Sequence, residues 1–512
     1  MSDGDTHQLG LTLPGHDGSK FYVEAVSGTE RLNEAYQFTV HVIATETLDF
    51  ASMVGKAASI TLGVADEEMT VHGVITVARM LDPTPNRDLA YAFVIEPALS
   101  LMRYSAQNQI YGTDQDVTPI DVIEAELSDG NKSSSNTGSD RPARSISYEM
   151  KATAGDYQTF DFLLQYGESD FNFLNRICER FGVFYCFDHS GDAEKVQFGD
   201  KNAHFQYVEG RSISKKITYR LPNISSAQGQ LCIHSFTAEC SAQSHSLKLT
   251  AYNDEKPSVD LTVATSTSFE GQGLVVHYNE NYAVKDDGEA LAKIRKEQLE
   301  TERMTFQGTS DVPLMRPGLI FELEEHPDSD YDKRYIVTEV HHDVVQQTPV
   351  GGSTIDFEAR PYENRFTCIP FDLPDNASFR PAPKTAKPVM SGFLLGTVDA
   401  EGDGKRAELD DFGRYKVTIM NEESGLGGGK ASFFLRKLEP YGGGSDEGSH
   451  FTLNKGTEVL IGSLGGDPDR LLIVGALSNG DATATVTSEN NTTAFRIRSA
   501  SGAVFELNDG AV

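Results

Sequence analysis

The sequence lacks several features that would assign it a chemistry. Its 512 residues include no tryptophan and only five cysteines, which are widely spaced and form no C-x-x-C pair. This pattern signals neither a zinc motif nor a redox motif, and it suits a reducing compartment. No run of about 18 apolar residues is present to span a bilayer, and the acidic start lacks the basic and apolar regions of a secretion signal. We therefore expect a protein that assembles in the cytoplasm and, if it leaves the cell, is exported without a cleaved signal peptide.

Basic residues are also scarce. Lysine and arginine total 44 against 76 aspartates and glutamates, which gives a formal net charge of −32. A surface this acidic repels phosphate backbones, so nucleic acid is excluded as an expected partner, and solubility is the simpler role for the charge. A hydrophobic content of 38% with 9% aromatics is enough for packed cores. The length predicts three or four domains.

Short strands dominate the expected secondary structure. Alternation of apolar and polar residues predicts strands over 8–45 and again from residue 59, at a spacing typical of an antiparallel barrel or sandwich. Three helices are expected at 118–127, 169–182 and 287–304. The first has Thr118 as N-cap followed by Pro119, and the second ends at Gly182 before a strand over 183–189. A hairpin is expected over 317–345.

A proline-rich segment marks the clearest boundary. Residues 370–388 carry five of the 20 prolines, which predicts an extended linker that buries little and separates two independently folded units. Beyond it, residues 391–480 alternate short strands with glycine turns, as in a small barrel such as an OB-fold. The last 30 residues alternate apolar and polar side chains (Phe495, Ile497, Val504, Phe505, Leu507) without a partner strand following in the chain.

Sequence patterns that resemble ligand sites fail on inspection. Residues 424–431 depart from the phosphate-loop pattern at both ends, and residues 399–410 end on Asp410 where a calcium loop needs glutamate. The aspartates of 328–332 are expected to lie in a solvent-exposed turn rather than to bind a metal. His341 and His342 are adjacent on an expected strand, so they face opposite sides and do not share a metal easily.

Catalytic signatures are missing as well. Neither G-x-S-x-G nor H-E-x-x-H occurs. Glycosidase carboxylate pairs have no spacing rule, so they stay open. We predict no catalytic residue, no cofactor, no metal ligand and no enzyme activity.

Four segments stand out along the chain: residues 11–42, residues 168–189 (ESDFNFLNRICERFGVFYCFDH), residues 408–419 (ELDDFGRYKVTI) and residues 455–479 (KGTEVLIGSLGGDPDRLLIVGALSN). In this order they resemble the VgrG family of type VI secretion spike proteins. Leu471 stands where the family usually has a proline. Within these segments the candidate structural residues are Gly413, Arg414, Gly456, Glu458, Gly465, Gly466, Asp467, Pro468, Asp469 and Arg470. The glycines and the proline suit turns, and Arg470 has Asp467, Asp469 or a neighbouring subunit as possible partners.

The resemblance implies a mainly β protein with some α structure, built as a trimer. Residues 1–375 would form a phage-hub-like region of two barrel-like modules with helices, 376–390 the linker, 391–480 an OB-fold neck and 481–512 the start of a trimeric β-prism. The implied partners are two further copies of the chain, an Hcp tube protein at the base, a PAAR-type tip protein, effectors and the target cell envelope. The implied function is a structural spike that caps the tube and punctures the target envelope.

Two other functions remain open at this point. One is a tailed-phage baseplate hub with peptidoglycan hydrolase activity, which would need a further globular segment of about 150 residues. The other is a host adhesin or carbohydrate-binding β protein. The lack of a secretion signal and the matches at 168–189 and 455–479 argue against the adhesin.

Overall fold

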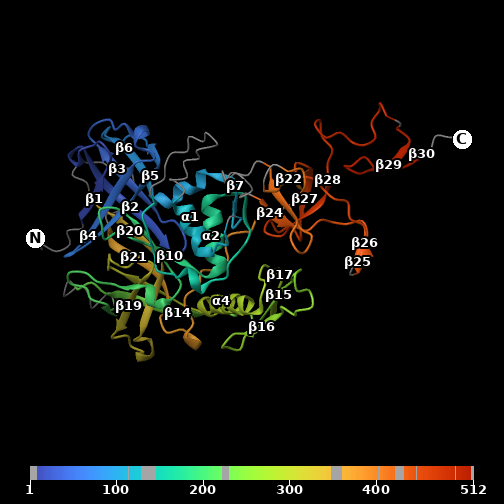
Figure 1. Ribbon diagram of the computed structural model, residues 1–512. Coiled ribbons are helices and arrows are strands. Elements are labelled where there is room, and N and C mark those ends of the chain that lie inside the picture. The colour runs from blue at the N-terminus through green and yellow to red at the C-terminus, as the bar shows by residue number, and fades with distance from the viewer. Residues whose placement is uncertain are drawn as a thin grey trace, which may run out of the picture.

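A computed structural model describes residues 8–113, 115–128, 146–221, 230–346, 360–401, 404–420, 432–444, 447–490 and 492–508. The described chain is built mainly of strands, with helices α1, α2 and α4 grouped between the N-terminal strands and the C-terminal barrel (Figure 1). No helix among these residues is both long and apolar enough to cross a membrane.

One large sheet connects the N-terminal strands to strands from beyond residue 300. Its order is β1-β4-β5-β6-β3-β2-β20-β21-β18-β14, and β12, β13 and β19 pair off this path. The strands are β1 (Gln8–Thr12), β2 (Phe21–Arg31), β3 (Gln37–Ala44), β4 (Ala57–Val64), β5 (Glu67–Met80), β6 (Leu89–Glu96), β12 (Gln206–Tyr207), β13 (Lys216–Thr218), β14 (Ile233–Cys240), β18 (Met304–Ser310), β19 (Leu319–Glu324), β20 (Arg334–Val345) and β21 (Arg360–Pro370). The predicted N-terminal strands and the β19–β20 hairpin are confirmed.

The sheet encloses two separate hydrophobic clusters. The first lies among β1 to β6 and contains the fully buried Phe38 and Phe93. The second lies among β14, β18, β19, β20 and β21 and contains Phe321 and Tyr335. Strand β20 pairs with β2 on one side and with β21 and β19 on the other. The two clusters therefore share one continuous hydrogen-bonded framework.

The three predicted helices are confirmed, and capping residues explain where two of them begin or end. Helix α1 (Pro119–Leu127) begins with a reciprocal capping box between Thr118 and Asp121. Helix α2 (Asp170–Phe181) begins after Ser169 and ends at Gly182, whose φ of 69° is the left-handed conformation that glycine adopts without strain. Helix α4 (Lys285–Arg303) begins two residues earlier than predicted.

Smaller sheets surround these helices. Strands β7 (Ala106–Tyr111) and β9 (Leu163–Ser169) pair with each other, and β8 (Tyr148–Met150), β10 (Phe184–Asp188) and β11 (Lys195–Gly199) form a second small sheet. Strands β15 (Ser246–Ala251), β16 (Val263–Ser266) and β17 (Leu274–Glu280) form a third. That third sheet packs against α4 through a small core that includes Leu249 and Leu291.

The C-terminal barrel is a five-stranded sheet. Its order is β24-β23-β22-β27-β28, made of β22 (Leu394–Val398), β23 (Tyr415–Ile419), β24 (Ser432–Leu435), β27 (Glu458–Ser463) and β28 (Leu471–Ala476). A parallel bridge from Lys437 to Ile473 brings the two ends of this order together. A short hairpin of β25 (Gly442–Gly444) and β26 (Glu447–Gly448) extends from the barrel (Figure 1).

The last strands pair with each other, contrary to the prediction that residues 483–512 have no partner in their own chain. Strands β29 (Ala494–Arg498) and β30 (Val504–Asn508) form an antiparallel hairpin with Phe495 opposite Leu507 and Ile497 opposite Phe505. A glycine turn at Gly502, with φ 91°, lets the chain reverse after Arg498. The apolar side chains of this hairpin remain between 40% and 58% exposed.

The proline-rich segment buries more than the extended linker that was predicted. Leu373, Ala377 and Phe379 are buried in a cluster with residues of β10, β19, β20 and β21. The Arg380 Nε donates to Glu297 of α4 at 2.6 Å, and its Nη1 donates to the Gly182 carbonyl at 2.9 Å. Proline fixes an extended backbone, but an extended segment still buries the apolar side chains between its prolines. The domain boundaries at 375, 390 and 480 stay predictions.

Candidate functional site

The predicted structural residues at 465–470 form a turn between β27 and β28. Gly465 and Gly466 both have positive φ, at 69° and 80°. A Cβ on Gly466 would lie 2.7 Å from the Val389 side chain, so this position tolerates only glycine without rearrangement. The Gly466 carbonyl accepts a hydrogen bond from the Met390 amide at 2.8 Å. The turn therefore holds the end of the proline-rich segment against the barrel.

Two aspartates of this turn share one lysine. The Lys387 Nζ lies 2.6 Å from Asp467 Oδ1 and 2.9 Å from Asp469 Oδ2. The other oxygen of Asp469 accepts the Leu164 amide of β9 at 2.9 Å. Burial opposes ionisation of Asp469, but Lys387, Arg176 and the Leu164 amide outweigh it and lower the pKa of this carboxyl. Asp469 thus connects the barrel, the proline-rich segment and the β7–β9 hairpin.

Arginines of the barrel contact the sheet of β15 to β17. The Arg470 Nη1 donates to the Asn279 carbonyl at 3.1 Å, whereas the ion pairs of Asp467 and Asp469 go to Lys387. The Arg414 Nη2 donates to Glu255 at 2.9 Å, and its Nε pairs with Asp410. Asp467 and Asp469 were considered as partners for Arg470, but neither forms an ion pair with it among the described residues. The Arg470 side chain instead bonds the backbone oxygen of Asn279 in its own chain.

The remaining predicted residues shape the barrel itself. Gly413 has φ 73° in the turn that Asp410 closes by accepting the Phe412 and Arg414 amides. Gly456 has φ 84° at the entry to β27, and the Glu458 carboxylate accepts the side-chain amide of Asn479 at 2.8 Å. Pro468 is buried.

The barrel and the N-terminal region share a hydrophobic core. Ile110, Phe162 and Leu164 of the β7–β9 region pack among the apolar residues of the barrel strands. The rings of Phe162 and Phe433 stack with their centroids 4.0 Å apart. Side chains from one part therefore complete the core of the other, and the division into two independently folded units stays a prediction. We call this set of contacts, made by Lys387, Asp467, Asp469, Phe162 and Phe433, the hub–barrel joint.

Two aspartates of the calcium-like pattern at 399–410 have partners in the structure. Asp399 lies 3.8 Å from Lys455, and Asp410 is occupied by the turn amides and Arg414. Residues 402–403 of the calcium-like pattern and all of 424–431 lie outside the described residues. His341 and His342 face opposite sides as predicted: His341 is exposed, whereas His342 is buried and bonds Glu30.

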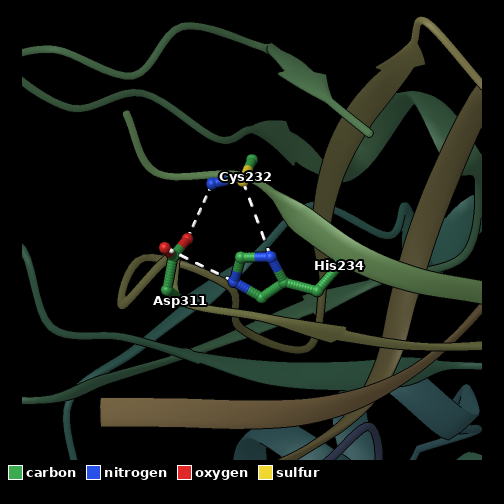
Figure 2. Close-up of side chains that lie close together, drawn as sticks. All are labelled: Cys232, His234 and Asp311. Atoms are coloured by element: carbon green, nitrogen blue, oxygen red, sulfur yellow. Dashed lines mark hydrogen bonds and ion pairs between the residues drawn. The ribbon is translucent and has the colours of Figure 1, made fainter. Parts of the chain in front are cut away.

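A second cluster, which the sequence did not reveal, joins Cys232, His234 and Asp311 (Figure 2). The His234 Nδ1 lies 3.7 Å from the Cys232 sulfur, and its Nε2 lies 3.4 Å from Asp311 Oδ2. Asp311 Oδ1 accepts the Cys232 amide at 2.6 Å. Hydrogen bonds to Asp311 and Cys232 raise the pKa of His234 to about 10. The signal in the sequence is the Cys-x-His spacing, but Cys232 precedes β14, His234 is an extra residue within that strand, and Asp311 is distant in sequence.

Comparisons with known proteins agree with this architecture. Residues 29–348 match the phage tail baseplate hub (GPD) family. The chain is 25% identical over 487 residues to the type VI secretion system spike protein VgrG4b of Pseudomonas aeruginosa, covering 92% of this chain and 56% of that protein. It is 28% identical to the actin cross-linking toxin VgrG1 of Vibrio cholerae over 322 residues, covering 62% of this chain and 28% of the toxin. The chain thus spans about half the length of the spike protein.

A solved structure shares the fold. The E. coli c3393 protein, a type VI secretion component described as structurally similar to the T4 bacteriophage tail proteins gp27 and gp5, matches with a TM-score of 0.62 and 21% identity. The match covers 91% of this chain and 99% of that one.

Proposed function

Because the chain belongs to the phage tail baseplate hub family, and within it to the VgrG spike proteins of type VI secretion, we propose that it forms the homotrimeric spike hub of a contractile injection machine. In this role residues 1–375 rest on a ring of tube protein, and the barrel and the C-terminal hairpin point away from it. The observation that carries the proposal is the match of residues 29–348 to the hub family together with the shared fold over 91% of the chain.

The C-terminal hairpin supports the homotrimer. Phe495, Val504, Phe505 and Leu507 are each more than half exposed in the single chain. An isolated two-stranded hairpin is marginal in water, and an exposed apolar edge favours pairing with another chain. Three copies around a common axis would cover these side chains and begin a β-prism. Closed rotational symmetry also suits a spike that meets a ring.

The five-stranded barrel supports the OB-fold neck. Its sheet order and the parallel bridge at Lys437 are compatible with a small, closed five-stranded barrel. The hub–barrel joint gives this neck a fixed position on the N-terminal region. A rigid neck is what a spike needs to transmit contraction force to its tip.

A mechanical role needs no enzyme activity in this chain. The Cys232, His234 and Asp311 cluster has the residue types of a thiol nucleophile, but Cys232 has no exposed surface for a substrate to reach. We therefore propose that this chain acts as a structural component. It would carry a tip protein and effectors and deliver them through the target cell envelope. The net charge of −32 argues against nucleic acid as a partner.

A release assay in the native host tests this proposal. Deletion of the gene, in a strain without other spike genes, is expected to abolish release of tube protein into the medium, because the tube has no cap on which to assemble. The full chain is expected to restore release. A chain ending at residue 480 is expected to restore much less, because it lacks the hairpin. Cellular levels of both chains, measured by immunoblot, serve as the control. Unchanged release in the deletion strain would refute the proposal.

A further inference from the structure

We propose that Cys232, His234 and Asp311 form a binding site for one divalent transition-metal cation of the zinc class. The site lies in the large sheet, away from the hub–barrel joint and the C-terminal hairpin. It does not depend on the proposed function, so either can fail without the other.

A β-bulge brings two of the ligands together. Ile233 pairs with Ser310, but the next pair is Ser235 with Thr309, so His234 is an extra residue in β14. A bulge of this kind redirects a side chain and is common beside functional sites. Here it places the His234 ring 3.7 Å from the sulfur of Cys232, which precedes the strand.

The third ligand comes from the neighbouring strand. Asp311 follows the last residue of β18, and its carboxylate contacts both the Cys232 amide and the His234 ring (Figure 2). One ligand atom from each of the three residues lies within 4.8 Å of the others. In a tetrahedral zinc site, bonds of about 2.0–2.3 Å separate adjacent ligand atoms by roughly 3.3–3.7 Å. His234 directs Nδ1 toward the sulfur and Nε2 toward the carboxylate, so a cation shared by all three residues requires the imidazole ring or the Asp311 carboxylate to rotate.

The chemistry of the cluster favours a borderline-soft metal. Thiolate, imidazole and carboxylate are all zinc ligands, and the thiolate disfavours calcium and magnesium, which take oxygen ligands. Two anionic ligands balance the charge of a divalent cation. The cation would use one ring nitrogen of His234, and the other nitrogen would then donate a hydrogen bond to a group that is not itself a ligand, the usual arrangement for a metal-bound histidine.

The burial of the cluster suits a bound ion better than a substrate. Cys232 is fully buried, whereas the side chains of His234 and Asp311 are 18% and 29% exposed. A cation can reach the site from the side of the histidine and carboxylate, and a water molecule can complete its coordination. A cysteine nucleophile would need its sulfur open to a substrate instead.

The experiment uses the full purified chain after removal of metal by a chelator. Zn²⁺ is added, excess is removed, and bound metal is measured by elemental analysis; Co²⁺ is titrated in parallel and followed by thiolate charge-transfer absorption. We expect one Zn²⁺ per chain, thiolate absorption with Co²⁺ and a higher Tm with Zn²⁺, because the metal binds only the folded site. Affinity should fall as the pH is lowered, since protons compete for the ligands.

Three variants and a matched control assign the site. Cys232→Ser is expected to abolish the thiolate absorption. His234→Gln and Asp311→Asn should each weaken Zn²⁺ binding at least about tenfold. Cys240→Ser, which changes an exposed cysteine at the other end of β14, should bind as the unaltered chain does. Circular dichroism checks that each variant is folded.

The outcomes are distinct. No bound Zn²⁺ in the unaltered chain, or Co²⁺ thiolate absorption that Cys240→Ser removes, would overturn the proposal. Binding by Cys232→Ser equal to that of the unaltered chain would do the same. If Cys232→Ser does not fold, His234→Gln and Asp311→Asn decide the question, because each retains all five cysteines.

Discussion

Glu30→Gln is expected to lower the free energy of unfolding by about 3–5 kcal/mol, the usual cost of leaving a buried charge without its partner. Glu30 and Arg316 are both buried, with the Arg316 Nε 3.1 Å from Glu30 Oε2 and the Nη2 also paired with it. The His342 Nε2 lies 3.0 Å from Glu30 Oε1. The substitution would leave the Arg316 guanidinium without a carboxylate in the interior of the large sheet.

The same pair gives a pH dependence. Burial alone would raise the pKa of Glu30, but Arg316 and His342 outweigh it and lower the pKa from 4.5 to about 2. The folded state therefore holds the proton more weakly than the unfolded state does. The ion pair contributes fully above the unfolded-state pKa of 4.5, and its contribution is lost as the pH falls toward about 2. In the Glu30→Gln variant, the free energy of unfolding should no longer show this decrease at acidic pH.

Urea unfolding, followed by circular dichroism, measures both effects. The matched control is Glu46→Gln, which breaks the exposed pair with Lys20 and should cost less than about 1 kcal/mol. Replacing Glu30 and Arg316 together by methionines should cost less than the sum of the single changes, because no charge is then left unpaired. Equal costs for Glu30→Gln and Glu46→Gln would show that the buried pair is not formed.

Asp469→Ala is expected to cost about 2–4 kcal/mol, because it removes one carboxylate from Lys387 and leaves the Leu164 amide without an acceptor. Lys387 keeps Asp467 as a partner, which limits the loss. The barrel should also become easier to separate from the N-terminal region, since Asp469 connects the two.

Urea unfolding and limited proteolysis within 376–390 test this prediction. Asp411→Ala, at an exposed aspartate of the same barrel, is the matched control and should change neither stability nor cleavage. Cleavage of Asp469→Ala at the rate of the unaltered chain, with unchanged stability, would mean that Asp469 does not hold the joint.

Local patterns in the sequence predicted the elements well, because local chemistry fixes them. Alternation along β2 and β3 and the end of α2 at Gly182 were visible without any tertiary information. Contacts between segments that are distant in sequence could not be predicted in this way. Glu30 meets Arg316 across 286 positions, and Asp469 meets Leu164 across 305. Neither pairing has a local signature.

The two main errors have physical causes of the same kind. The proline-rich segment was expected to bury little, yet Phe379 is buried between β10 and the segment around Phe205. Composition predicted its backbone but not what its apolar side chains would contact. The Cys232 cluster was missed because a bulge and a neighbouring strand assemble it. The motif at 465–470 was found from the family resemblance, but only the structure gives Asp469 its three-way contact.

The mass of the full chain in solution tests the central claim most directly. Light scattering at micromolar concentration and moderate salt should give three times the chain mass of 56.0 kDa. The trimer should tighten as salt screens the charge of −32 on each copy, and a chain ending at residue 480 should dissociate more readily. A monomer mass for the full chain under these conditions would contradict the account of a trimeric spike hub.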